Sequence, residues 1–170
     1  MRKTNTLSQD RERFNGNFTQ QEPIPDAGIQ RALEVLQSGR LHRYNVVEGE
    51  KSDTALLETE FAEYQGARFC LACASGGYAM QVALSSFGLE YGEPVLTNAF
   101  TLSPVPGAVH NVGGKPVLVE TTEQLVIDLV DLERKIESSG SRVLLLSHMR
   151  GHIADMDHLC DLLDQKGVSL

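Results

Sequence analysis

The sequence predicts an α/β fold of three layers, in which helices cover both faces of a mostly parallel β-sheet. Short apolar runs alternate with stretches whose apolar residues recur every three or four positions, and glycines stand at many of the junctions. Such runs are typical of buried strands, and the longer spacing is typical of amphipathic helices. Strands that alternate with helices of about three turns form βαβ units, whose right-handed crossovers generate a parallel sheet.

The polar N-terminal segment is predicted to stand apart from this domain. Residues 1–25 show little periodicity and end in Pro23-Ile24-Pro25, so we expect an arm rather than a packed element. Residues 26–170 then form the α/β domain. Its first helix is predicted around Leu33, where apolar residues share one helical face, and Gly39 ends it.

The next segment contains a connection, a helix and a strand. Residues 40–51 have no clean period, and we expect an irregular loop there. The helix that follows has Ser52 or Asp53 as its N-cap and ends at Gly66. The apolar run Arg68–Ala74 (RFCLACA) is then predicted to form a buried strand.

Helices and strands alternate from there to the C-terminus. One predicted helix follows Ser75-Gly76-Gly77 and ends at Gly88, and another covers Leu102–Val112. Two more contain the apolar residues from Leu129 to Ile136 and from Met156 to Leu163, and end at Gly140 and Gly167. The predicted strands are Pro94–Thr97, Pro116–Val119 and Arg142–Ser147. A further apolar run begins at Val168–Leu170, whereas a typical strand has about five or six residues. We therefore expect that the chain is truncated within a strand, with a short edge strand as the alternative.

Composition and charge argue against several classes of function. A net charge of -8 disfavours a nucleic-acid surface, which needs clustered Lys and Arg. No apolar run approaches the roughly 20 residues that span a bilayer, and the polar start at Met1–Asp10 lacks the apolar core of a signal peptide. Three cysteines do not form a disulfide framework. We expect a cytoplasmic protein that handles small molecules and contacts neither nucleic acid nor membrane.

The cysteines are predicted to be core residues. Cys70 and Cys73 have a spacing that also occurs in redox motifs and metal sites. Residues three apart in a strand point to opposite faces, so the predicted strand favours two buried thiols. Cys160 continues the apolar face of the last predicted helix, and we expect it in the core as well.

Histidines and aspartates gather before that last helix, at His148, His152, Asp155, Asp157 and His158. Side chains of these types bind zinc or iron. However, Gly151 interrupts the helical spacing of the two histidines, and carboxylates at the start of a helix are stabilised by its dipole. We therefore expect a helix start rather than a metal site.

The turn Ser75-Gly76-Gly77 lies between a predicted strand and a predicted helix. The first N–H groups of a helix have no internal partners and lie at the positive end of its dipole. Glycines allow a phosphate to approach the backbone closely, so the turn is a candidate phosphate site. A plain tight turn is the alternative. The residues match neither the Walker loop nor GxGxxG.

Four segments resemble, in order and in spacing, the motifs of the DegT/DnrJ/EryC1/StrS aminotransferase family. They are Glu58–Leu84, Pro94–Thr101, Gly113–Val119 and His148–Asp157. The second, which reads PVLTNAFT, resembles the family's VITPAFTF, and the fourth, HMRGHIADMD, resembles HLYGQPADMD. The resemblance extends over roughly residues 39–170.

This resemblance implies a fold and an activity. The fold would be part of the large domain of pyridoxal-phosphate (PLP) fold type I, with pyridoxal 5′-phosphate at the interface of a homodimer. The activity would be transfer of an amino group from an amino-acid donor to a keto-sugar or a similar carbonyl. One alternative is a sugar dehydratase that uses pyridoxamine phosphate, since some family members carry histidine in place of the cofactor lysine. The other is a non-catalytic remnant or dimerisation module.

The resemblance also implies which residues contact the cofactor phosphate. Ser75, Gly76 and Gly77 would form the phosphate site, with the backbone N–H groups of the two glycines as donors. The family usually has threonine where this chain has Gly77, so a hydroxyl contact is missing here.

The pyridine ring would lie against the stretch from Phe100 to Leu102. The aromatic residue that the family usually stacks on the ring corresponds to Leu102, and Phe100 is the substitute within this chain. His148 would lie at the end of a strand near the cofactor pocket, since ligands in open α/β sheets gather at the carboxyl ends of strands.

The catalytic residues of the family have no counterpart in this sequence. The acidic residue that pairs with the pyridine nitrogen belongs to the strand that begins where the chain ends, and the lysine that binds the cofactor comes later. Lys115 and Lys166 lie in other motifs and do not correspond to that lysine. We therefore expect no complete catalytic set within these residues.

Overall fold

The structure, a computed structural model, describes residues 16–17 and 19–170. Most of the predicted arm therefore lies outside the described residues, and residues 19–25 are exposed and form no helix or strand. The chain divides into two compact units, the first ending at Cys70 and the second running from Leu71 to Leu170.

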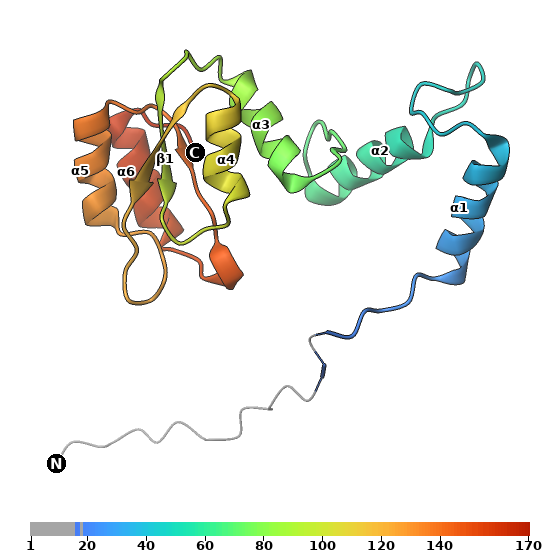
Figure 1. Cartoon of the computed structure of the whole chain (residues 1–170), viewed down its shortest axis with the longest axis horizontal. Helices are drawn as coiled ribbons and strands as arrows, with labels where there is room; N and C mark the ends of the chain where they lie inside the picture. The colour runs from blue at the N-terminus through green and yellow to red at the C-terminus, as the bar shows by residue number, and fades with distance from the viewer. Residues whose placement is uncertain (1–15, 18) are drawn as a thin grey trace. The chain divides into compact units, whose positions relative to one another are not determined.

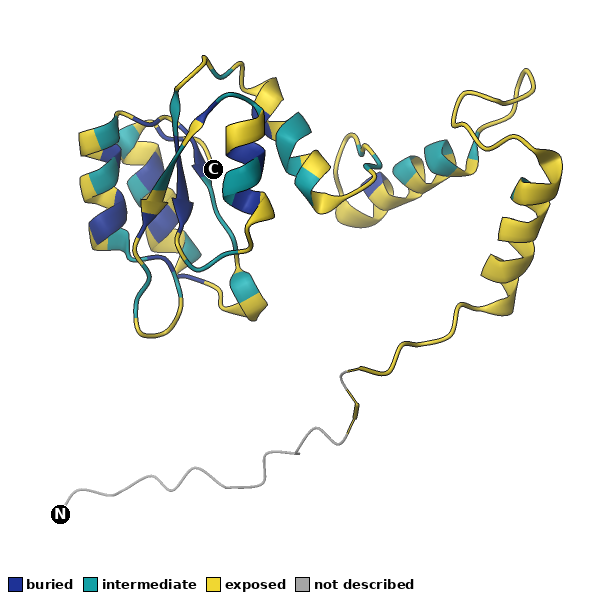
Figure 2. Cartoon of the chain, in the orientation of Figure 1, coloured by how far each residue is buried: buried dark blue, intermediate teal, exposed yellow. Residues whose placement is uncertain are grey.

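In the described part of the first unit, the chain forms two helices, α1 (Asp26–Ser38) and α2 (Asp53–Gln65). Both end at the glycine that the sequence predicts, and α2 begins directly after the predicted N-cap Ser52. The Ser52 hydroxyl caps α2 by accepting a hydrogen bond from the N–H of Ala55, and a left-handed glycine ends each helix, with φ of 68° at Gly39 and 65° at Gly66. α1 has no buried residue, and α2 buries only Ala62 (Figure 2).

The second unit contains four α-helices, one short 3-10 helix and three strands. The helices are α3 (Gly76–Ser86), α4 (Pro104–Asn111), α5 (Leu129–Ser139) and α6 (Met156–Lys166), with the 3-10 helix at Met149–Gly151. The strands are β1 (Pro94–Asn98), β2 (Lys115–Val119) and β3 (Leu144–Leu145). The sheet order is β2-β1-β3, and both pairs of neighbours are parallel.

The three-layer α/β/α fold with a parallel sheet is confirmed. α5 and α6 lie on one side of β1, and α4 lies on the other (Figure 1). Neighbouring residues of β1 point to opposite faces, so Leu96 packs with Leu132 and Leu159, whereas Val95 packs with Leu84 and Ala108. Each fully buried aliphatic side chain stabilises the fold by roughly 1.5–3 kcal/mol relative to an exposed one.

The predicted strand Arg68–Ala74 is wrong. These residues form no helix or strand, and Phe69 within them is 77% exposed. A strand forms only where a neighbour exchanges backbone hydrogen bonds with it, and within the described part of the chain β1 pairs with β2 and β3 alone. The argument for burying Cys70 and Cys73 fails with the strand, and both are free thiols of intermediate exposure.

Two other expectations need correction. Cys160 is exposed rather than in the core, because Leu159 and Leu163 already form the inward face of α6 at helical spacing. The strand expected at 142–147 shortens to Leu144–Leu145, because these are its two residues in register with β1.

The last residues pair with the free side of β3. Val143 and Ser169 form a parallel bridge. The N–H of Leu144 donates to the Ser169 carbonyl at 2.8 Å, and the N–H of Ser169 donates to the Arg142 carbonyl at 2.9 Å. The apolar run at the C-terminus therefore continues the parallel sheet.

Candidate functional site

The carboxyl edge of the sheet brings most of the predicted site residues into one region. Because all three strands are parallel, the loop after β1, with Phe100 and Leu102, and the loop after β3, with His148, leave the sheet at the same edge. The turn before α3 also lies here. A Cβ built on Gly77 would be 3.7 Å from the Cβ of Pro104, the first residue of α4.

The turn Ser75-Gly76-Gly77 has the geometry of an anion site. The Ser75 hydroxyl caps α3 by accepting a hydrogen bond from the N–H of Tyr78 at 3.2 Å. The N–H groups of Gly76 and Gly77 precede the first bonds within the helix. The first turn of α3 contains no acidic residue, so the positive end of its dipole is not neutralised locally. The turn therefore fits a phosphate group.

The two glycines of this turn have different surroundings. A Cβ on Gly76 would meet nothing within 4 Å, which leaves open space for a ligand. A Cβ on Gly77 would make ordinary contacts, 3.7 Å to Pro104 and 3.9 Å to the Ser75 hydroxyl. Steric exclusion of a Cβ therefore does not require glycine at position 77.

Two buried hydroxyl groups near the end of β1 lack a partner. Thr97 Oγ1 and Thr101 Oγ1 are buried and make no hydrogen bond within the described part of the chain. A buried polar group without a partner costs about 1–3 kcal/mol, and such groups in native proteins mark places where a ligand, ion or water completes the bonding. They are consistent with a polar ligand at this edge.

Asn98, which the sequence analysis missed, links the two loops. Its side chain is 1% exposed. Its Nδ2 donates to the carbonyl of Phe100 at 2.8 Å and to the carbonyl of Ser147 at 3.0 Å. Its Oδ1 accepts from the N–H of Ser147 at 2.9 Å. One signal was visible in the sequence, because Asn98 stands where the motif VITPAFTF has proline.

The remaining predicted contacts differ in exposure. Phe100 is half-buried, Leu102 is 58% exposed, and His148 is exposed. His148 immediately precedes the 3-10 helix, in which Arg150 has a left-handed φ of 58°. The contacts place the turn at Gly77 beside Pro104, and Phe100 beside the segment that precedes His148.

Neither lysine discussed above lies in this region as a free amine. Lys115 begins β2, at the opposite edge of the sheet. Lys166 pairs with Glu137 at 2.7 Å and Glu133 at 2.9 Å. Glu137, and then Glu133, raise the pKa of Lys166, which keeps it a cation, whereas a nucleophilic amine must be neutral.

The histidine and aspartate cluster forms a helix start. The Asp155 carboxylate caps α6 by accepting a hydrogen bond from the N–H of His158 at 3.1 Å, as the helix-start interpretation predicted. Among residues 16–17 and 19–170, no group of three or more His, Cys, Asp or Glu side chains could hold a metal ion.

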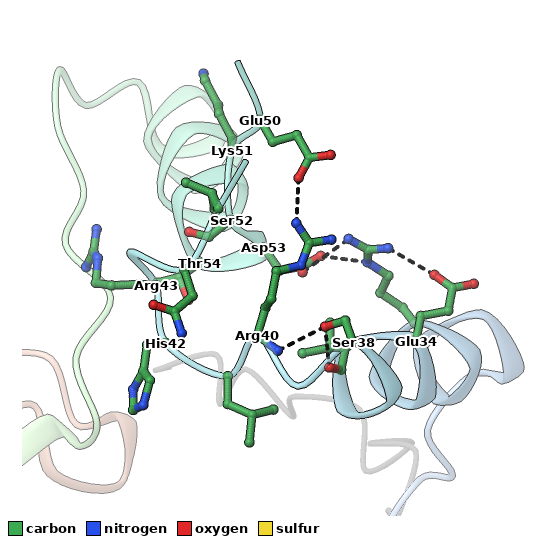
Figure 3. A pocket seen from close by; sticks show the side chains of 15 residues that line it. Glu34, Ser38, Arg40, His42, Arg43, Glu50, Lys51, Ser52, Asp53 and Thr54 are labelled. Atoms are coloured by element: carbon green, nitrogen blue, oxygen red, sulfur yellow. Dashed lines mark hydrogen bonds and ion pairs between the residues drawn. The ribbon is translucent and has the colours of Figure 1, made fainter. Parts of the chain in front are cut away.

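A separate cavity of about 240 Å³ lies within the first unit, between residues 31 and 54 (Figure 3). Its arginines are already paired with carboxylates. Arg31 bonds Asp53 at 2.7 Å and Glu34 at 2.9 Å, and Arg40 bonds Glu50 at 2.9 Å. An anionic ligand would have to displace these partners, so the ion pairs hold the unit together rather than form a ready binding site.

Comparison with known proteins gives a family match over most of the chain. A sequence model described as the DegT/DnrJ/EryC1/StrS aminotransferase family matches residues 24–170. The dTDP-3-amino-3,4,6-trideoxy-alpha-D-glucose transaminase of Streptomyces venezuelae is 35% identical over 146 residues, which are 85% of this chain and 36% of that protein. The protein of the same name from Micromonospora megalomicea subsp. nigra is 29% identical over 114 residues, 67% of this chain and 30% of that protein.

A solved structure shows the same fold. The crystal structure of S. venezuelae DesV in complex with a ketimine intermediate is 31% identical, has a TM-score of 0.68, and matches 84% of this chain and 36% of that one. The chain thus spans about a third of the length of the relatives it matches. No helix in the described residues is long and apolar enough to cross a membrane.

Proposed function

Because the chain belongs to the DegT/DnrJ/EryC1/StrS aminotransferase family, we propose that it forms the N-terminal part of a sugar aminotransferase. The reaction is transfer of an amino group from an amino-acid donor to a keto-sugar or a similar carbonyl. The names of the relatives support the sugar class, since both of those described above are transaminases of a deoxysugar nucleotide.

The observation that carries the proposal is the phosphate-compatible turn at the carboxyl edge of the sheet. The cofactor of this family is pyridoxal 5′-phosphate, which when bound supplies the electron sink for amino transfer. Gly76 and Gly77 would hold its phosphate through their backbone N–H groups, and Ser75 shapes the turn as the N-cap of α3. Phe100 and Leu102 lie on the ring side of the site, with His148 at the end of the next loop.

The site formed by these residues is incomplete. Neither Lys115 nor Lys166 corresponds to the cofactor lysine of the family, and no residue of this sequence corresponds to the acidic residue that pairs with the pyridine nitrogen. Residues 1–170 therefore bind and orient the cofactor phosphate but do not complete amino transfer by themselves. The chain contributes the phosphate end of the site and one wall of the ring pocket.

A homodimer is part of the proposal. Among the described residues of the first unit, Ala62 is the one buried apolar side chain, while Leu57 is 54% exposed and Phe61 is 48% exposed on α2. Leu33 and Leu36 are likewise exposed on α1. Large exposed apolar patches mark interaction surfaces, and a second copy of the chain is the partner that the family relationship suggests.

The free thiols support a reducing, cytoplasmic location.

Two measurements test the function: binding of the cofactor to the chain, and the coding sequence read beyond Leu170. The chain is titrated with pyridoxal phosphate, and binding that inorganic phosphate competes away supports the proposal. A reading frame that continues through an acidic residue and a later lysine supports the transaminase. Histidine at the lysine position would instead indicate the pyridoxamine-phosphate-dependent dehydratase. If the chain binds no cofactor and the reading frame shows no such continuation, the result would support the alternative of a non-catalytic module.

A further inference from the structure

The Asn98 side chain continues the link between β1 and β3 beyond the point where the backbones of these two strands stop pairing. The parallel register between β1 and β3 reaches Thr97 and Leu145. One residue later the Asn98 side chain both accepts from the N–H of Ser147 and donates to its carbonyl. Its carboxamide thus acts as an additional peptide group between the two diverging loops.

The same carboxamide fixes the loop that carries the ring-contact candidates. Nδ2 donates to the carbonyl of Phe100 at 2.8 Å, and Asn98 itself is buried. Removing the carboxamide would leave the carbonyls of Phe100 and Ser147 without this donor. Because the position that usually carries the stacking aromatic is Leu102 here, the ring contact depends on Phe100, whose backbone Asn98 holds.

We propose that Asn98 is the positioning residue of the cofactor-ring pocket, setting the place of Phe100 and of the segment leading to His148. This inference rests on the proposed function, because the ring pocket belongs to that site. Asn98 does not contact the ring. It acts through Phe100, so its effect on ligand affinity depends on the Phe100 side chain.

The chain offers a matched control at the other end of the same strands. Ser141 is 4% exposed, and its hydroxyl lies 2.8 Å from the Pro94 carbonyl and 3.0 Å from the Val143 carbonyl. It therefore joins the start of β1 to the chain before β3, as Asn98 joins the ends. If both residues are purely structural links, their substitution should affect stability and ligand affinity in the same way. If Asn98 is a positioning residue, only its substitution should weaken ligand binding.

The experiment measures binding of pyridoxamine phosphate to the wild-type chain, Asn98→Ala, Ser141→Ala, Phe100→Leu and the Asn98→Ala/Phe100→Leu double variant. This probe is an amine and cannot react with surface lysines. Urea unfolding gives the stability of each variant, and amide exchange reports the loops at 99–103 and 146–152. Should Asn98→Ala not fold, Asn98→Asp replaces it, because Asp keeps the acceptor for the N–H of Ser147.

We expect Asn98→Ala to weaken binding at least fivefold and to speed exchange in both loops. Ser141→Ala should lose comparable stability yet bind within twofold of wild type. In the Phe100→Leu background, the effect of Asn98→Ala should fall below twofold, because coupled residues are not additive. Provided that the wild-type chain binds, three results would overturn this inference but leave the proposed function standing. They are an Asn98→Ala variant that binds as tightly as wild type, a Ser141→Ala variant whose binding is weakened equally, or losses of affinity that are additive in the double variant. No binding by the wild-type chain would overturn the proposed function as well.

Discussion

A Cβ placed on Gly77 would lie 3.7 Å from the Cβ of Pro104, so the first turns of α3 and α4 are neighbours and a Cβ at position 77 would make an ordinary contact there. The family usually has threonine at this position. Gly77→Thr is therefore expected to fit the turn and to place a hydroxyl beside the cofactor phosphate.

The added hydroxyl should tighten binding of pyridoxamine phosphate. A hydrogen bond to a charged group contributes about 1.5–3 kcal/mol, which corresponds to roughly tenfold or more in affinity. Gly77→Ala is the control, because it adds the Cβ and raises helix propensity without a hydroxyl. Equal affinities of the Thr and Ala variants, measured by calorimetric titration, would contradict this account of the missing contact.

Leu102→Tyr tests the second departure from the family. An aromatic pair contributes about 0.5–1.5 kcal/mol beyond its buried area, so binding should tighten roughly two- to tenfold. Leu102 is 58% exposed, and the free chain should therefore keep its unfolding midpoint. Leu102→Met controls for size. If Tyr and Met bind the cofactor equally, the ring does not lie against this residue.

Acid should destabilise the second unit through Asp131. Burial raises the pKa of this carboxyl group, but hydrogen bonds from the Glu120 N–H, Arg134 and Lys135 outweigh burial and lower the pKa from 3.8 to about 2. A carboxyl group whose pKa is lower in the folded state contributes stability above pH 4, and this contribution disappears as the pH falls towards 2.

Asp131→Asn should therefore cost roughly 1–2 kcal/mol of unfolding free energy at neutral pH and progressively less below pH 4. Urea unfolding of both proteins between pH 2.5 and 7 measures the difference. Asp161→Asn is the control, because Asp161 is exposed on α6. Asp128→Asn would not serve, since Asp128 caps α5. A stability difference between wild type and Asp131→Asn that does not change with pH would contradict the assignment.

Salt should loosen the first unit selectively. Arg31 bonds Asp53 and lowers its pKa, and Arg43 bonds Glu58 at 2.7 Å, while the unit has almost no apolar core. Exposed ion pairs weaken as ionic strength rises. Amide exchange in α1 and α2 is expected to accelerate between low and high salt, whereas exchange in α4, which has no Lys, Arg, Asp or Glu and buries three apolar residues, stays constant. Equal acceleration in all three helices would show that the ion pairs do not stabilise the first unit.

The sequence predicted the elements whose signals are local. Gly39, Gly66, Gly140 and Gly167 all adopt the left-handed conformation that ends a helix. The strands at β1 and β2 also lie where their apolar runs indicate. The capped turn Ser75-Gly76-Gly77 before α3 was likewise visible, because it needs only a cap, two glycines and a helix that starts there.

The features that failed or were missed depend on distant partners. The run Arg68–Ala74 is as apolar as a strand, but its composition does not say whether another strand pairs with it. The link between Asn98 and Ser147 joins residues 49 positions apart, and no periodicity reports a side chain that bonds a distant backbone. Cys160 lies beside a buried position of α6, so a small error in the helical face reversed its assignment.

The central claim is that the turn at Gly76 binds a phosphate, and binding of pyridoxamine phosphate to Gly76→Asp tests it most directly. Space around Gly76 is open, and a carboxylate in the first turn of a helix is stabilising, so the variant should fold at least as well as wild type. Its charge should repel the phosphate and weaken binding at least tenfold. Ser85→Asp, near the other end of α3, adds the same charge and should bind as wild type does. Undiminished affinity in a folded Gly76→Asp would contradict the claim.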